Sequence, residues 1–338
     1  MAKIDIFAPQ DTNMVGGLEG QKILIYGGND TGKTYQSTRL PAPMLLMSEA
    51  GGNARKVIKF PINEWNDFTQ IVDQLVKSYS KAKESFQTII IDTDEALVAI
   101  NEDGIAKQYG VAEVGMVQEA AKGNPNGYAV SRSRFKNQIN RLARQGYTVV
   151  FISHEMLDDT VGSPTYGKII PYGSNKEKGS TKFIRDLCDF VIYTYANGVD
   201  SETGKTIYSS AICKETDKVF ARSRYPMMQT YIKEFTAENL TQAIEDAIAK
   251  TAEDEGAGLV SFKDVTVIGD YTKEDYIQLL QPYVEKLFKL YPDYVLEQVE
   301  MQLGSGAKIT EATEEQVSEL GSLYSTFVDF CTQRNISI

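Results

Sequence analysis

One segment of eight residues constrains the fold of this chain more than any other feature. Residues 27–34 read Gly-Gly-Asn-Asp-Thr-Gly-Lys-Thr, which matches the phosphate-loop pattern G-x-x-x-x-G-K-[ST]. An apolar run at 22–27 precedes it and a short helical stretch follows, the context that separates a phosphate loop from a chance glycine-rich turn. We therefore predict that the chain binds ATP and Mg²⁺. The nucleotide-binding residues would be Gly27, Gly28, Asn29, Asp30, Thr31, Gly32, Lys33, Thr34 and Tyr35.

The loop pattern assigns separate roles to its last two polar residues. Lys33 would bridge the β- and γ-phosphates, and the Thr34 hydroxyl would bind Mg²⁺. Asp92 ends the apolar run at 88–91, and we expect its strand to neighbour the phosphate loop. A carboxylate at that place holds the water shell of the metal. The alternative for Asp92 is a strand-end aspartate that caps a turn.

Apolar runs separated by helical segments predict an α/β fold. Runs that are apolar throughout are typical of a mainly parallel sheet covered by helices on both faces. Two β-rich runs further on, at 190–195 and 206–214, flank a turn at 200–204 and predict an antiparallel hairpin that extends the sheet. The parallel strands are expected at 22–27, 44–47, 88–91 and 148–152, and helices at 33–40, 64–79 and 129–145.

Changes in local composition along the sequence predict three structural regions. Residues 1–235 would form the ATPase core, and residues 236–261 an acidic, solvated helix with a linker. The acidic part is clear at 245–255, which holds five acids against one lysine. Residues 262–338 show tyrosines and leucines at helical spacing and predict a small, mainly helical C-terminal module.

Charge and composition limit the classes of function. The net charge of −11 argues against non-specific coating of nucleic acid, although a local basic groove stays compatible with it. The N-terminus lacks an apolar signal core, and the three cysteines are widely spaced and form no metal-ligand pattern. We expect a cytoplasmic protein.

Hydrolysis requires a group that orients and deprotonates the attacking water. Many ATPases of the AAA+ type place a glutamate directly after the metal-binding aspartate, but Thr93 follows Asp92 here, and Asp94 and Glu95 lie further past the strand end. Glu49, which follows the strand at 44–47, is the preferred candidate. A loop-capping role for Glu49 is the alternative.

The position of Glu49 resembles that of the catalytic glutamate in RecA-like ATPases. Over residues 18–230 the chain is similar to small RecA-like phage ATPases that act in single-strand annealing and recombination. The resemblance rests on Leu40-Pro41, the turn at 48–52, Trp65 with Phe68, and Ile152-Ser-His-Glu155. It implies a RecA-like P-loop NTPase core with a catalytic Glu49.

The same resemblance implies roles further along the chain. His154, the only histidine, corresponds to a γ-phosphate sensor. In oligomeric RecA-like ATPases, cations near the later β-run reach the neighbouring subunit's γ-phosphate. The matching candidates are Lys214, Arg222 and Arg224, within a homo-oligomeric ring or filament that holds ATP at its subunit interfaces. A solvated charged hairpin is the alternative for these three.

Two basic segments are candidates for contact with single-stranded DNA, one on the helix at 129–145 and one in the loop after His154. RecA-like recombinases carry a mobile DNA-binding loop at the second place. Tyr166 and Tyr172 offer aromatic platforms for base stacking beside these cations. Solvated surface charge is the alternative. The candidates are Arg132, Arg134, Lys168, Lys176, Lys178 and Lys182.

The leading hypothesis is therefore a DNA-dependent ATPase that acts on single-stranded DNA in phage recombination or annealing, with a single-strand-binding or replication protein as a candidate partner. A second hypothesis keeps the ATPase and replaces DNA by a protein client, as in a helicase loader or a regulatory switch. A third is an ATP-gated assembly protein that hydrolyses little ATP.

Overall fold

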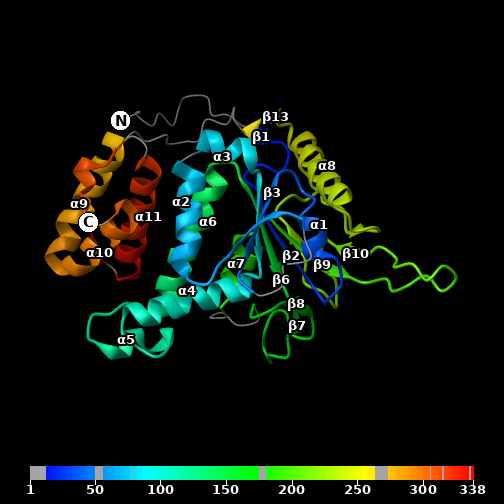
Figure 1. The fold of residues 1–338 in the computed structure, drawn as a ribbon, viewed down its shortest axis with the longest axis horizontal. Helices are drawn as coiled ribbons and strands as arrows, with labels where there is room; N and C mark the ends of the chain where they lie inside the picture. Colours follow the sequence, from blue (N-terminus) through cyan, green and yellow to red (C-terminus); the bar gives the residue numbers. More distant parts are fainter. Residues whose placement is uncertain are drawn as a thin grey trace.

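A mainly parallel sheet forms the centre of the molecule (Figure 1). The computed structural model describes residues 13–49, 56–77, 79–174, 180–262, 273–304, 306–313, 316–334 and 336–338. Within these ranges nine strands form the sheet, in the order β12-β10-β9-β2-β6-β5-β3-β4, with β11 paired to β9. Their bounds are β2 Lys22–Gly27, β3 Pro43–Met47, β4 Ile58–Pro61, β5 Thr88–Asp92, β6 Thr148–Ser153, β9 Phe190–Tyr195, β10 Ser210–Ile212, β11 Arg222–Ser223 and β12 Tyr231–Ile232.

The strand order places β6 between the phosphate-loop strand β2 and the Asp92 strand β5. All three are parallel to one another. β5 therefore does not pair with β2, but its Asp92 end lies beside the phosphate loop, as expected, and contacts Thr34. Sequence order does not fix which parallel strands pair, because a crossover connection can pass over an intervening strand. The carboxyl ends of β2, β6 and β5 nevertheless meet at one edge of the sheet.

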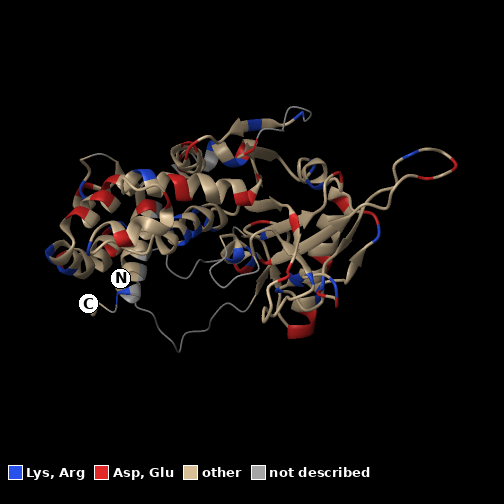
Figure 2. Cartoon of the chain, turned by 90° about the horizontal axis from the view of Figure 1, so that it is seen from below, with Lys and Arg blue, Asp and Glu red and all other residues tan. Residues whose placement is uncertain are grey.

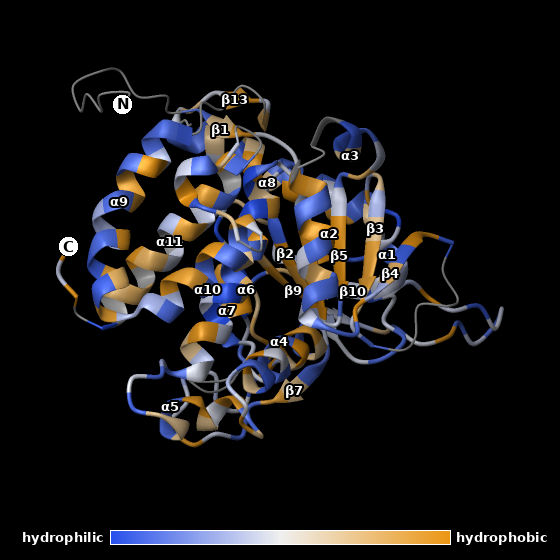
Figure 3. Ribbon diagram, turned by 60° about the vertical axis from the view of Figure 1, so that its left-hand side comes forward, coloured by the Kyte–Doolittle hydropathy of each residue, from blue (hydrophilic) through white to orange (hydrophobic). Residues whose placement is uncertain are grey.

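Helices cover both faces of the sheet, as predicted. Along β2, Leu24 and Tyr26 face one core cluster while Ile23 and Ile25 face the other, because successive strand side chains point to opposite faces. Figure 3 shows the apolar strands between the helical layers. The first face carries α2 Trp65–Lys77, α3 Tyr79–Ser85, α4 Asp94–Gln108, α6 Gly127–Arg144 and α7 Lys182–Leu187, and the second carries α1 Lys33–Ser37 and α8 Ala237–Glu255.

The predicted hairpin extends the sheet. β10 runs antiparallel to β9, with Ser210 opposite Tyr195, and β12 continues the sheet beyond β10. Between β9 and β10 the chain projects away from the body of the molecule (Figure 1). Two small pairings lie outside the sheet. They join β1 Met14–Val15 to β13 Leu259–Val260, and β7 Glu155–Leu157 to β8 Ile169–Pro171.

The acidic helix α8 corrects the expectation of a solvated segment. Thr236 caps its start by accepting a hydrogen bond from the Asn239 backbone N–H, and Gly256 ends it with a φ of 66°. Between them Leu240, Ile244 and Ile248 are buried against the sheet, and a helix turns these i, i+4 positions to one face. The acidic residues counted at 245–255 lie away from this buried face, so their number did not reveal it.

The C-terminal helices form a separate apolar cluster, with Leu280, Leu287 and Phe327 fully buried in it. Within the described ranges, no helix is long and apolar enough to cross a membrane. Figure 2 shows acidic and basic residues interspersed along this part of the chain. The helices are α9 Lys273–Leu290, α10 Pro292–Leu303 and α11 Val317–Gln333, and short helical segments lie at α5 Val117–Ala120, Val114–Met116 and Ile309–Glu311.

A buried ion-pair network attaches α11 to the core. Arg141 of α6 is 3% exposed and pairs with Asp73 at 2.7 Å and with Glu319 of α11 at 3.1 Å. Asn137 on the same helix donates to the Thr326 hydroxyl at 2.8 Å. These contacts fix the side of α6 that faces α11.

Replacing Glu319 by Gln removes one charge from this network and leaves Arg141 with a single carboxylate. Removal of one partner from a buried ion pair is strongly destabilising, so we expect the free energy of unfolding to fall by on the order of 3 kcal/mol. Urea unfolding of Glu319→Gln measures this loss against Glu300→Gln, a control at an exposed position of α10. Equal midpoints for the two variants would contradict the prediction.

Candidate active site

The phosphate loop is held in a curled shape by glycines and by β9. Gly27 has a φ of 152°, and a Cβ atom built on it would lie 2.2 Å from the Thr194 carbonyl oxygen. Gly32 has a φ of 82°, a region that favours glycine. The Thr194 hydroxyl donates to Thr31 Oγ1 at 2.9 Å. A side chain at position 27 is therefore excluded by the neighbouring strand.

Lys33 lies inside the curl of the loop. Its Nζ donates to the carbonyl oxygens of Gly27 at 2.8 Å and Gly28 at 2.6 Å, and the residue is 8% exposed. Burial lowers the pKa of this amine, against the attraction of Asp92 and Glu155. An anionic phosphate beside the ammonium would offset its desolvation, so the loop fits the triphosphate of a nucleotide.

Thr34 and Asp92 meet across the intervening strand. The Thr34 hydroxyl donates to Asp92 Oδ2 at 2.8 Å, because both residues lie at the carboxyl edge of the sheet. Burial raises the pKa of Asp92, although the Thr34 hydrogen bond and Lys33 act in the opposite direction. A divalent cation would stabilise the charged form of this carboxylate. The pair of a hydroxyl and a buried carboxylate thus fits Mg²⁺.

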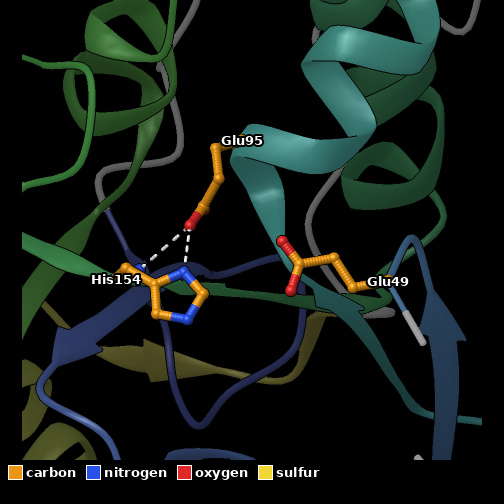
Figure 4. A group of neighbouring side chains, drawn as sticks. All are labelled: Glu49, Glu95 and His154. Atoms are coloured by element: carbon orange, nitrogen blue, oxygen red, sulfur yellow. Dashed lines mark hydrogen bonds and ion pairs between the residues drawn. The ribbon is translucent and has the colours of Figure 1, made fainter. Parts of the chain in front are cut away.

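Glu49, Glu95 and His154 gather beside the phosphate loop (Figure 4). One ligand atom from each lies within 4.8 Å of the others. The Glu95 carboxylate contacts His154 Nδ1 and accepts from the His154 backbone N–H at 3.3 Å. The Thr93 hydroxyl donates to Glu49 Oε1 at 2.8 Å. Two strand ends and the first turn of α4 therefore bring two carboxylates and an imidazole to one place.

The two carboxyls at the start of α4 have opposite pKa shifts. Asp94 is fully buried, and burial raises its pKa well above the ordinary value. Burial also acts to raise the pKa of Glu95, but hydrogen bonds from Asp94 and His154 outweigh it and hold this pKa below the ordinary value. Glu95 is therefore the charged member of this pair at neutral pH.

Two site residues escaped the sequence analysis. Glu95 was set aside because it lies past the end of β5, yet the first turn of α4 returns its side chain to His154. Glu155 was read only as part of a motif, but its Oε1 lies 3.4 Å from the Cβ position of Gly28. Its Oε2 is buried without a hydrogen-bond partner among the described residues. Adjacency to Asp92 and His154 was the available signal for both.

Comparison with known proteins agrees with this geometry. Residues 19–225 match the model of a family described as AAA domain. The chain belongs to this AAA domain family. It is also 36% identical over 338 residues to the SPbeta prophage-derived uncharacterized protein YorG of Bacillus subtilis strain 168, a match that covers 98% of this chain and 99% of the relative. The chain is accordingly an AAA-type NTPase with a prophage relative.

In this AAA-domain protein, the three predicted trans-acting cations lie at the opposite edge of the sheet. Arg222 pairs in register with Val191 near the start of β9 and donates to the Cys188 carbonyl oxygen at 3.0 Å. Arg224 forms an ion pair with Asp189 at 3.4 Å and keeps 54% of its side chain exposed. Lys214 donates to the Pro226 carbonyl oxygen at 2.9 Å. They are thus remote from the phosphate loop of their own chain.

The predicted DNA-binding cations of the AAA-domain protein lie in different surroundings. Arg134 is partly buried over the Trp65 ring, at 5.4 Å from its centroid, so it does not lie on an open basic track. Lys168 pairs with Glu215 and Lys182 with Asp186, each at 2.6 Å. Arg132 is partly exposed. Lys176 and Lys178 lie outside the described residues.

Substituting Asp92 by Asn should separate metal binding from folding. The amide keeps a partner for Thr34 but cannot attract the cation, so Mg²⁺-dependent binding of ATP should weaken about 10- to 100-fold. Because the folded-state pKa of Asp92 is raised, its charge opposes folding above that pKa, and the metal-free variant should unfold no earlier than the parent. Titration calorimetry with and without Mg²⁺, with Asp103→Asn as the surface control, measures the effect. Unchanged Mg²⁺ dependence would refute it.

Proposed function

We propose that this AAA-type NTPase is an ATP hydrolase with a RecA-like arrangement of its catalytic groups. Lys33 contacts the β- and γ-phosphates, and Thr34 with Asp92 holds Mg²⁺, which neutralises phosphate charge when bound. Glu49 accepts a proton from the attacking water. Support comes from its place two residues after the end of β3, and from the Thr93 hydroxyl that donates to its carboxylate at 2.8 Å. Glu49 is also exposed, so water can reach it.

His154 serves as the sensor of the γ-phosphate. Its Nδ1 contacts Glu95, so a proton on Nδ1 is favoured by this charged carboxylate. With Nδ1 protonated, Nε2 accepts a hydrogen bond in the neutral ring and donates one in the imidazolium. Glu95 is thus a positioning residue that sets the orientation and tautomer of the ring, and Ser153 supports it by donating at 3.4 Å.

The client of this ATPase is single-stranded DNA, bound in phage recombination or annealing. The observation that carries this proposal is a backbone link from the sensor to the candidate DNA loop. The Tyr172 N–H donates to the His154 carbonyl oxygen at 2.9 Å, and the Thr181 hydroxyl donates to the Tyr172 carbonyl oxygen. Tyr166 and Tyr172 are 59% and 51% exposed, as stacking platforms require. A change at the γ-phosphate would thereby reach the loop through one residue.

Oligomerisation would complete the active site in trans. Arg224 is more than half exposed and lies at the edge of the sheet opposite the phosphate loop of its own chain. A ring or filament that joins these two edges would bring Arg224 of one subunit to the γ-phosphate of the next. Arg222 and Lys214 are held by backbone carbonyls and would position that surface.

Glu49→Gln should retain ATP binding and lose turnover. The amide has nearly the same shape but cannot accept the proton, and loss of a general base lowers kcat by about 10²- to 10⁴-fold. Filter binding of ATP and phosphate release measure the two properties, with Glu64→Gln as an exposed control. If Glu95→Gln abolished turnover and Glu49→Gln did not, the assignment of the base would be wrong.

Single-stranded DNA should stimulate ATP hydrolysis, and Tyr172→Ala should weaken DNA binding. Loss of one base–aromatic stack reduces affinity by about 1–3 kcal/mol, which is roughly a 5- to 150-fold change in Kd. ATPase rates with and without an oligonucleotide, at two salt concentrations, test this against Tyr208→Ala, an exposed tyrosine on the projecting hairpin. If single-stranded DNA neither stimulated hydrolysis nor was retained by the protein at low salt, DNA would be excluded as the client.

A protein client is the second candidate, favoured by the apolar surface of the C-terminal helices. Phe288 and Leu290 on α9 and Leu296 on α10 are 47%, 51% and 56% exposed. Exposed apolar groups that gather on one module are typical of protein-binding surfaces. If Phe288→Ser with Leu296→Ser abolished function in phage growth while DNA-stimulated hydrolysis stayed unchanged, this surface would be the binding site of a further protein.

A further inference from the structure

A cavity of about 520 Å³ lies between the ATPase core and the C-terminal helices. Residues of α2, α4 and α6 line one side of it, and residues of α10 and α11 the other. Figure 1 shows these helices side by side, on the far side of the molecule from α8. The volume falls within the usual range of about 300–1,000 Å³ for small-molecule sites. The cavity does not include the phosphate loop.

Arg134 lines this cavity. Burial lowers the pKa of its guanidinium to about 10, and the attraction of Glu297 on α10 acts in the opposite direction. Its Nε is buried and has no hydrogen-bond partner, and no described residue forms an ion pair with the group. Two helical turns further on, Arg141 also lines the cavity and also has an unpartnered Nε, but its two terminal nitrogens pair with Asp73 and Glu319.

The difference in ion pairing makes Arg134 the arginine of this cavity that can take an anionic ligand. A partly buried guanidinium loses hydration, and without an ion pair this loss is only partly compensated. Its planar donors match a phosphate or a carboxylate. The face of Trp65, 5.4 Å away, holds the guanidinium in place by a cation–π contact.

The rest of the lining is rich in amides and aromatic rings. Asparagine and glutamine are its most numerous residues, among them Asn66, Gln70 and Gln298, and such side chains pair with the donor and acceptor edges of nucleobases. The rings of Tyr294 and Phe330 line the cavity and stack on each other, with their centroids 4.0 Å apart. Aromatic rings bind bases by stacking.

We propose that this cavity is a second nucleotide site, which binds a nucleoside monophosphate. The phosphate is held by Arg134, and the base lies among the amides of the core and the C-terminal helices. The site is independent of the phosphate loop and does not rest on the proposed ATPase mechanism. Since α4 extends from Glu95 at the active site towards the cavity-lining Tyr109, one helix joins the two sites.

Titration calorimetry on the full-length protein tests this proposal. The phosphate loop is first saturated with Mg²⁺ and a non-hydrolysable ATP analogue, and AMP, GMP, CMP, UMP and inorganic phosphate are then titrated separately. We expect at least one monophosphate to bind with one-to-one stoichiometry. Arg134→Gln should weaken this binding at least tenfold, while Arg144→Gln, an exposed arginine of the same helix, should leave it unchanged.

A second variant keeps Arg134 and fills the space. Ser133 lines the cavity, and Ser133→Leu should abolish the binding while ATP hydrolysis and thermal unfolding show that the fold is kept. No binding of any monophosphate to the parent protein would overturn the proposal, as would binding that survives both substitutions. Inorganic phosphate that binds as tightly as the best monophosphate would overturn the assignment of a nucleoside. Failure of DNA-stimulated hydrolysis affects none of these outcomes.

Discussion

The hydrogen bond between Thr34 and Asp92 is the contact on which the rest of the site depends. It joins the helix that follows the phosphate loop to the end of a strand two places away in the sheet. Because β6 lies between those strands, its end, Ser153, is placed within this bridge, and His154 follows directly. The bridge forms only because all three strands are parallel and end at one edge. An antiparallel β6 would bring the start of that strand to this edge instead.

Electrostatics at this edge of the sheet favour the joint binding of an anionic phosphate and a cation. Burial raises the pKa of Asp92 and lowers that of Lys33, so each group is destabilised in its charged form. A phosphate beside Lys33 and a cation beside Asp92 relieve both shifts together. Glu155 adds a further buried carboxylate beside the loop. Binding of nucleotide and metal together would therefore stabilise the charged forms of both groups.

Much of this core follows from the sequence, because apolar runs and helical periodicity report directly on burial. Glu49 and His154 could be predicted to lie together at this edge, since strand ends converge in any parallel sheet. Glu95 was missed for a local reason: the direction of the first helical turn, which returns its side chain to His154, depends on where α4 starts. Arg134 was assigned to an open DNA track because the sequence shows which residues share a helix face but not whether distant residues cover it. Here α10 and α11 do so.

The packing of α11 on α6 therefore has two consequences of opposite kind. Arg141 is neutralised by Glu319 from α11 and becomes part of the structure. Arg134, two turns earlier on the same face, is covered by the same module, whose Glu297 attracts the guanidinium but forms no ion pair with it among the described residues. A partly buried guanidinium without an ion pair is only partly compensated, and this weakens the interface unless a further anion approaches it. The phosphate of the proposed second nucleotide would complete that compensation beside the polar cavity.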